Sequence, residues 1–299
     1  MEKFYLVIIK KDGTIVHDIF ATSHQDLVAK YLSVDEVKHH EYFRAIYSPK
    51  ENYRYDDIEN YVLTIAENHI PEWYGGNFKN QILKQLKTII KSMIVKKRKK
   101  LLLHEGAILT SKAIINEVKH SIIFAMYDES QIKVVDSSSE IKIMTDDTII
   151  DSIKDNCKVD EMYGFSKIKE MRDYAKVLKM YGQAKIGGMF ENSRIVTLKG
   201  DANIMEMHDD SQAERLKHMS RVDEMHNHSI IEELWDWSVV EKMFDYARIN
   251  YMDEDSKVIE MYGNSMIEEM YGNSVIEKLY ENSVVRKLND AAKILSQQL

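Results

Sequence analysis

The chain has 299 residues, of which 44% are hydrophobic and 30% charged, and its formal net charge at pH 7 is −8. This composition excludes wholesale disorder, and no apolar run approaches the roughly 20 residues that cross a bilayer. The start, MEKFYLVIIKKDG, lacks the small-residue cleavage site of a secretory signal, so we expect a cytoplasmic protein with no membrane partner. The net charge is +3 over residues 1–118 and −11 over 119–299, which indicates an acidic C-terminal part.

Residues 1–76 carry the pattern of a small α+β domain. Two apolar runs flank a Lys-Asp-Gly turn and predict a β-hairpin over residues 3–20. A serine that suits an N-cap then predicts a short helix, and a third strand is expected over residues 42–47. Asp56 and Asp57 favour a further helix, whose apolar side would carry Ile58, Tyr61, Val62 and Ile65.

Residues 77–95 predict an amphipathic helix with apolar residues at helical spacing on one face. Its other face is basic, and the chain runs on into a cluster of cations. The basic residues are Lys84, Lys87, Lys91, Lys96, Lys97, Arg98, Lys99 and Lys100. In one interpretation the helix caps the open end of the following region, and residues 77–118 are a cap with transition strands. In the other, these cations contact nucleic acid or another polyanion.

A nine-residue unit recurs from about residue 119 to the C-terminus. Every ninth residue from Cys157 to Ala292 is Ser, Ala or Cys, and we call this position of the repeat the small slot. Two residues later comes Ile or Val, with Ala213 as the one exception, and three residues further comes Met or Leu. A short period held without insertions over this length indicates a repeat architecture.

The period favours strands over helices. Nine residues turn a helix by roughly 900°, so equivalent residues of successive repeats would point in opposite directions. The small slot and the Ile/Val slot share one face of a strand, but the Met/Leu slot has the wrong parity, so a bend must lie between them. The residue two places after Met/Leu is often Gly or Asp, which are turn formers.

One strand and one turn per repeat predict a parallel β-solenoid over residues 119–299, with coils about 4.8 Å apart. We expect two repeats per coil, because Gly164, Gly182 and Gly200 recur at double the period. The inward slots would then stack as three ladders of small, β-branched and long flexible side chains. The predicted fold class is therefore mainly β, with a small α+β domain and a capping helix in front of the solenoid.

The far end of the repeat region departs from the pattern. Gln297 stands where Met or Leu is expected, and Gln298 follows it. These residues are interpreted either as a polar cap or as part of an open coil that pairs with a second copy to give a homodimer. The expected partner is thus another protein or the chain itself.

Two groups of side chains suggest binding sites. His208 and His226 share one slot two repeats apart, so they are candidate ligands for a metal ion, against the simpler interpretation of a solvated outer face. Aromatic residues follow the Met/Leu slot in many units, and they either form an interaction strip or shield the turns. The strip residues are Trp235, Tyr262, Tyr271 and Tyr280.

Motifs for catalysis are missing from the sequence. It contains no phosphate-binding glycine loop, His-Glu-x-x-His, Gly-x-Ser-x-Gly or Cys-x-x-Cys, so we expect neither a cofactor nor an enzyme. Cys157 is the single cysteine and occupies a small slot, which favours inert packing over a reactive thiol. The acidic repeats allow a further hypothesis, in which a regular negative surface imitates DNA and occupies a DNA-binding protein.

The units Met261-Tyr-Gly-Asn-Ser and Met270-Tyr-Gly-Asn-Ser are similar to short-repeat tracts of uncharacterised bacteriophage and bacterial proteins. The resemblance covers roughly residues 160–299 and brings no functional residues. Calcium-binding nonapeptide rolls share the period, but this chain lacks their Gly-Gly-x-Gly-x-Asp loops. Pentapeptide-repeat proteins also stack small and long inward residues, with a period of five. The sequence therefore predicts a binding or structural scaffold, with a nucleic-acid-directed protein, either decoy or binder, as the alternative.

Overall fold

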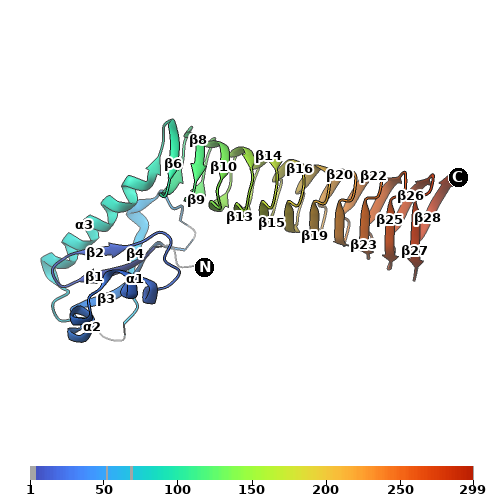
Figure 1. Cartoon of the computed structure of the whole chain (residues 1–299). Helices are drawn as coiled ribbons and strands as arrows, with labels where there is room; N and C mark the ends of the chain where they lie inside the picture. The colour runs from blue at the N-terminus through green and yellow to red at the C-terminus, as the bar shows by residue number, and fades with distance from the viewer. Residues whose placement is uncertain (1–4, 52, 68–69, 299) are drawn as a thin grey trace. The chain divides into compact units, whose positions relative to one another are not determined.

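The computed structural model describes residues 5–51, 53–67 and 70–298, and the chain divides into two compact units (Figure 1). The first unit extends to Val95 and includes Glu105–Ile108. The second comprises Lys96–His104 and the chain from Leu109 onwards.

A four-stranded antiparallel sheet forms the centre of the first unit, in the order β2-β1-β3-β4. Residues on one face of β1 pack with Leu27 of the first helix, while Phe43 on β3 contacts the rings of Trp73 and Tyr74. Phe78 at the start of α3 contacts the same two rings, which places this helix against the sheet. The elements are β1 (Leu6–Lys10), β2 (Ile15–His17), α1 (His24–Tyr31), α2 (Val34–His39), β3 (Tyr42–Pro49), η1 (Ile58–Asn60), β4 (Tyr61–Ile65), α3 (Gly76–Met93), β5 (Ile94–Val95) and β7 (Gly106–Leu109).

The structure confirms the predicted hairpin, the capped helix and the third strand, but the helix expected after Asp57 is wrong. Only a 3-10 turn forms there, and Tyr61–Ile65 is strand β4, paired antiparallel with β3. Tyr-Val-Leu-Thr-Ile is rich in the aromatic and β-branched residues that suit a half-buried strand, and pairing with β3 outweighs the helical spacing. The basic helix forms as α3 and belongs to the first compact unit, so this unit is longer than the predicted domain of residues 1–76.

The second unit is a parallel β-solenoid, as predicted, and Figure 1 shows its coils stacked in sequence. Each coil gives one strand to each of two parallel sheets, the even sheet and the odd sheet. The even sheet contains β6 (Lys99–Leu103), β8 (Ile114–Lys119), β10 (Gln131–Asp136), β12 (Ile149–Ile153), β14 (Lys167–Met171), β16 (Lys185–Met189), β18 (Asn203–Met207), β20 (Arg221–Met225), β22 (Val239–Met243), β24 (Lys257–Met261), β26 (Val275–Tyr280) and β28 (Lys293–Gln298). In this unit the odd sheet contains β9 (Ile122–Met126), β11 (Glu140–Met144), β13 (Lys158–Met162), β15 (Lys176–Met180), β17 (Arg194–Leu198), β19 (Gln212–Leu216), β21 (Ile230–Leu234), β23 (Arg248–Met252), β25 (Met266–Met270) and β27 (Val284–Leu288).

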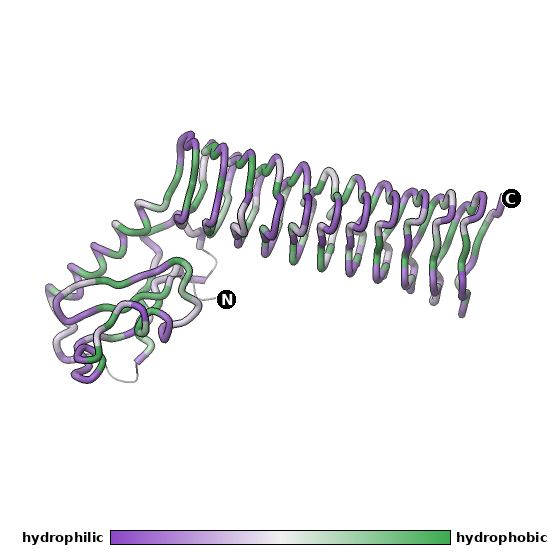
Figure 2. Tube along the Cα trace, viewed as in Figure 1, coloured by the Kyte–Doolittle hydropathy of each residue, from purple (hydrophilic) through white to green (hydrophobic). Residues whose placement is uncertain are grey.

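Register confirms two repeats per coil. Val258 pairs with Ile276, and Ile276 pairs with Ile294, so the β-branched slots form one ladder. From β13 to β25 the paired residues are the first, second, fourth and fifth of each strand, while the second and fifth are buried. The bend that the sequence requires therefore lies at the third residue. Figure 2 shows the resulting alternation of apolar and polar stretches along each coil.

Each turn depends on one residue in the left-handed region. From Asp146 to Asp290 the second residue after Met/Leu has a φ between +54° and +74°, whether it is Gly, Asp, Asn, Glu or His. An acidic side chain at this position accepts a hydrogen bond from the backbone N–H of the equivalent residue one coil earlier, as Asp173 does from Asp155 and Asp209 from Glu191. The acids of the turns thus connect successive coils.

Serine in the small slot points inward and is fully buried in most coils. Its hydroxyl can donate to the carbonyl three residues earlier, as Ser274 does to Tyr271 at 2.7 Å. Within the described residues the hydroxyl of Ser220 has no such partner, and Ala202 fills the same slot one coil earlier. The slot therefore requires small volume more than it requires a hydroxyl group.

We expect Ser220→Ala to change the free energy of unfolding by less than about 1 kcal/mol, because no hydrogen bond is lost. Ser220→Leu should overpack the ladder and cost about 1–3 kcal/mol. Thermal melting followed by circular dichroism measures both changes. A Leu variant as stable as the wild type would contradict the close packing of this ladder.

Candidate functional site

Six rings form a continuous stack beside the even sheet, which we call the ring column. Neighbouring ring centroids are 4.7–5.3 Å apart with interplanar angles of 10° or less, and the guanidinium of Arg172 lies 4.6 Å from the first ring. The column consists of Phe190, His208, His226, Phe244, Tyr262 and Tyr280. Because equivalent residues lie one coil apart, the strand spacing of about 4.8 Å sets the ring separation.

His208 and His226 are neighbours as predicted, but their geometry does not favour a shared metal ion. Their rings are stacked at 4.7 Å and 5°, and the Nε2 atoms lie 3.0 and 3.1 Å from the carboxylates of Glu206 and Glu224. Nitrogen lone pairs lie in the ring plane, so two parallel rings cannot direct them at one ion. Across the described residues no group of three or more His, Cys, Asp or Glu is arranged to hold a metal.

The four residues of the predicted interaction strip do not lie together. Tyr262 and Tyr280 belong to the ring column, whereas Trp235 and Tyr271 follow strands of the odd sheet. The ring of Tyr251 contacts both, tilted at 40° to Trp235 and stacked on Tyr271. All four are half-buried. The indole N–H of Trp235 donates to Glu233 at 3.1 Å, and Lys217 lies over its ring. These contacts support the interpretation that such rings shield the turns.

Five strongly exposed apolar residues of the solenoid lie two positions after the slot of these rings, directly before the small slot, and none of them was predicted from the sequence. Most units have a polar residue there, so a large apolar residue at this position was the available signal. The exposed residues are Phe165, Tyr174, Met219, Trp237 and Tyr246. Met219 and Trp237 are separated by 18 residues, which makes them neighbours on one corner of successive coils.

The predicted polyanion contact is divided between the two compact units. On α3, Lys84 and Lys91 are exposed, while Lys87 donates to Glu59 at 2.5 Å within the same unit. The run from Lys96 to Lys100 belongs to the solenoid unit. Lys96, Lys97, Arg98 and Lys100 are exposed there, and Lys99 is half-buried.

Ion pairs break up the acidic surface of the solenoid. Lys142 bonds to Glu140 at 2.7 Å and to Asp160 at 3.2 Å, and Lys158 pairs with the same two acids. Similar pairs across neighbouring coils include Lys278 with Glu260 at 2.9 Å. The acids of the strands are thus interspersed with cations, so they do not form a uniformly negative face.

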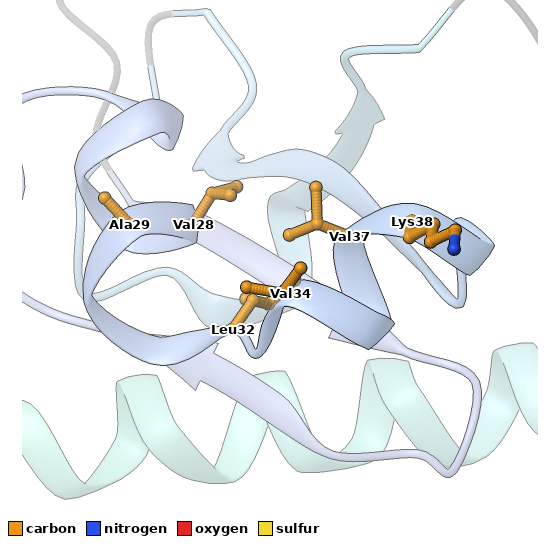
Figure 3. Close-up of a pocket in the computed structure, with 6 residues that line it drawn as sticks. All are labelled: Val28, Ala29, Leu32, Val34, Val37 and Lys38. Atoms are coloured by element: carbon orange, nitrogen blue, oxygen red, sulfur yellow. The ribbon is translucent and has the colours of Figure 1, made fainter.

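An apolar hollow of about 470 Å³ lies between α1 and α2 in the first unit (Figure 3). Five of its six lining residues are aliphatic, and the sixth contributes a lysine side chain. The lining residues are Val28, Ala29, Leu32, Val34, Val37 and Lys38. Such a surface suits an apolar side chain, and Lys38 is its one polar lining residue.

Comparison of the chain with protein-family models, with curated proteins and with solved structures finds no match. Among the described residues, no helix is both long enough and apolar enough to span a membrane.

Cys157 lies in the small slot, fully buried, and its Sγ accepts from the backbone N–H of Ser139 at 3.3 Å. Burial raises the pKa of its thiol to about 12. We therefore expect no reaction with a thiol reagent at about pH 8.5, where an exposed cysteine is half ionised. One equivalent should react after denaturation, and rapid labelling of the native protein would show that this coil opens.

Proposed function

We propose that the protein is a non-enzymatic β-solenoid scaffold that binds a protein partner and associates with a second copy through its last coil. One observation carries the second part of this proposal. Val258 and Ile276 are fully buried, but the equivalent Ile294 in β28 is only half-buried. Val284, Leu288 and Leu295 in the same coil are 46%, 50% and 60% exposed. This coil presents apolar side chains that a second copy would cover.

The arrangement of strands also supports association about a two-fold axis. In the part of the chain that the structure describes, β27 and β28 are the terminal strands of their sheets, and neither pairs with a further strand on its outer side. Any two-fold axis perpendicular to the solenoid places the edges of two copies antiparallel, a geometry that strands pair in readily. The inward ladders would then continue from one copy into the other.

Light scattering at about 100 µM should give twice the mass of one chain. Leu288→Asp together with Leu295→Asp should reduce this to a single chain, because charges would have to be buried in the contact. Phe165→Asp is the matched control, since Phe165 is equally exposed in the middle of the solenoid. A monomeric wild type, or a double variant that keeps the dimer mass, would overturn the proposed contact.

Nucleic-acid binding is the second candidate function, and the exposed run of Lys96, Lys97, Arg98 and Lys100 favours it. The decoy hypothesis has less support, because cations are interspersed with the acids of the solenoid.

A DNA binder should lose affinity steeply with salt, and Lys97→Glu should lower the slope of log K against log salt by about 0.9 for each lost phosphate contact. Lys185→Glu makes the same charge change on β16, five strands away from β6 in the even sheet, and should leave the slope unchanged. Fluorescence anisotropy of a labelled duplex measures both. If no salt-dependent binding occurs, the basic run has no such role.

A further inference from the structure

The corner that carries Met219 and Trp237 has an ordered arrangement of charge. The slot before the small residue contains Asp201, Met219, Trp237 and Asp255 in four successive coils. All four side chains are exposed, Met219 at 61% and Trp237 at 63%. Two apolar side chains therefore lie side by side between two carboxylates, along a line parallel to the solenoid axis.

The spacing of this line follows from the coil repeat. At about 4.8 Å per coil, the two aspartates are about 14 Å apart, and the midpoint of the apolar pair is about 7 Å from each. An extended peptide rises about 3.4 Å per residue and points alternate side chains to the same side. Its residues i, i+2 and i+4 thus lie at about 0, 7 and 14 Å. These three positions match the first aspartate, the midpoint of the apolar pair and the second aspartate.

Two further acids lie on the neighbouring slot. Asp236 occupies the turn position directly before Trp237, and Glu254 occupies the same position one coil later. A hydrogen bond with Asp236 raises the pKa of Glu254, so two acids are held close together here. The backbone N–H of His218 donates to Asp236, and this bond, together with the cation of Lys217, lowers the pKa of Asp236. This pair is therefore already partly compensated, so the charge of the corner comes mainly from the two aspartates that flank the apolar pair.

We propose that Asp201, Met219, Trp237 and Asp255 bind an extended peptide segment in which two basic residues flank an apolar residue at alternate positions. The apolar side chain packs on Met219 and Trp237, and the basic side chains pair with the aspartates. This inference rests on the scaffold function proposed above and names the chemistry of its partner. Trp and Met are both enriched in the cores of protein interfaces, and Trp is enriched among the residues that carry most of the binding energy.

The probe is a labelled, end-blocked heptapeptide, Gly-Lys-Ser-Leu-Ser-Lys-Gly, titrated with the full-length protein and followed by fluorescence anisotropy. Its control is Gly-Lys-Lys-Ser-Ser-Leu-Gly, which has the same composition in another order. The first peptide should bind roughly fivefold more tightly, and its affinity should fall with salt, because two exposed ion pairs form only with the correct spacing.

Variants locate the site on the protein. Trp237→Ala should weaken binding about tenfold or more, and Asp201→Asn with Asp255→Asn roughly fivefold. Tyr174→Ala should have no effect, because Tyr174 is 64% exposed but lies between Asn156 and Asn192 in its own column. All these side chains are exposed, so the fold should be kept, which far-ultraviolet circular dichroism checks.

Equal affinity for the two peptides, unchanged binding by the Trp237 variant, or no binding of the labelled peptide at millimolar protein would each overturn the inference. Light scattering of the same samples separates this result from the scaffold proposal. If the peptide does not bind but the protein keeps the mass of a dimer, only the corner site is refuted. A monomeric wild type counts against the proposed self-association independently of the peptide.

Discussion

Hydrogen bonds between the backbones of successive coils are the constraint on which the rest of the solenoid depends. The N–H of Tyr181 donates to the carbonyl of Met162 at 2.9 Å, and the same bond recurs from coil to coil. Because strands in such a sheet are about 4.8 Å apart, every side chain has the equivalent side chain of the next coil as its neighbour. Small slots and β-branched slots therefore stack on their own kind, and so do the six rings of the ring column. One sequence rule thus sets both the packed interior and the surface.

The surface shows two different uses of aromatic residues. The ring column is half-buried, its faces are occupied by neighbouring rings, and polar atoms of His208 and Tyr262 are bonded to nearby glutamates. Such rings have few faces or polar atoms free to contact a partner. Trp237 lies two positions beyond Trp235, yet its side chain is exposed and sits between acidic slots. Position within the repeat, more than residue type, decides which aromatic residue is available for binding.

The sequence predicted the solenoid well because its slots repeat without a gap, so local preference and global stacking agree. Strand parity even located the bend between the Ile/Val and Met/Leu slots. Prediction failed where only tertiary contacts decide. Tyr61–Ile65 has helical spacing but pairs with β3. Trp235 and Tyr262 share a slot but follow strands of different sheets. The exposed corner was missed because one substitution in a periodic column has no meaning until the coils are stacked.

The alternation of repeats between two sheets also governs how such a chain can change its length. Removing or duplicating 18 residues takes out or adds one whole coil, and every downstream side chain keeps its sheet and its column. Removing nine residues instead transfers every downstream strand to the opposite sheet. The two corners would then exchange their residues beyond that point. Recombination that adds or removes two repeat units therefore keeps the arrangement of the outer side chains. The gain or loss of a single unit exchanges the two corners beyond that point.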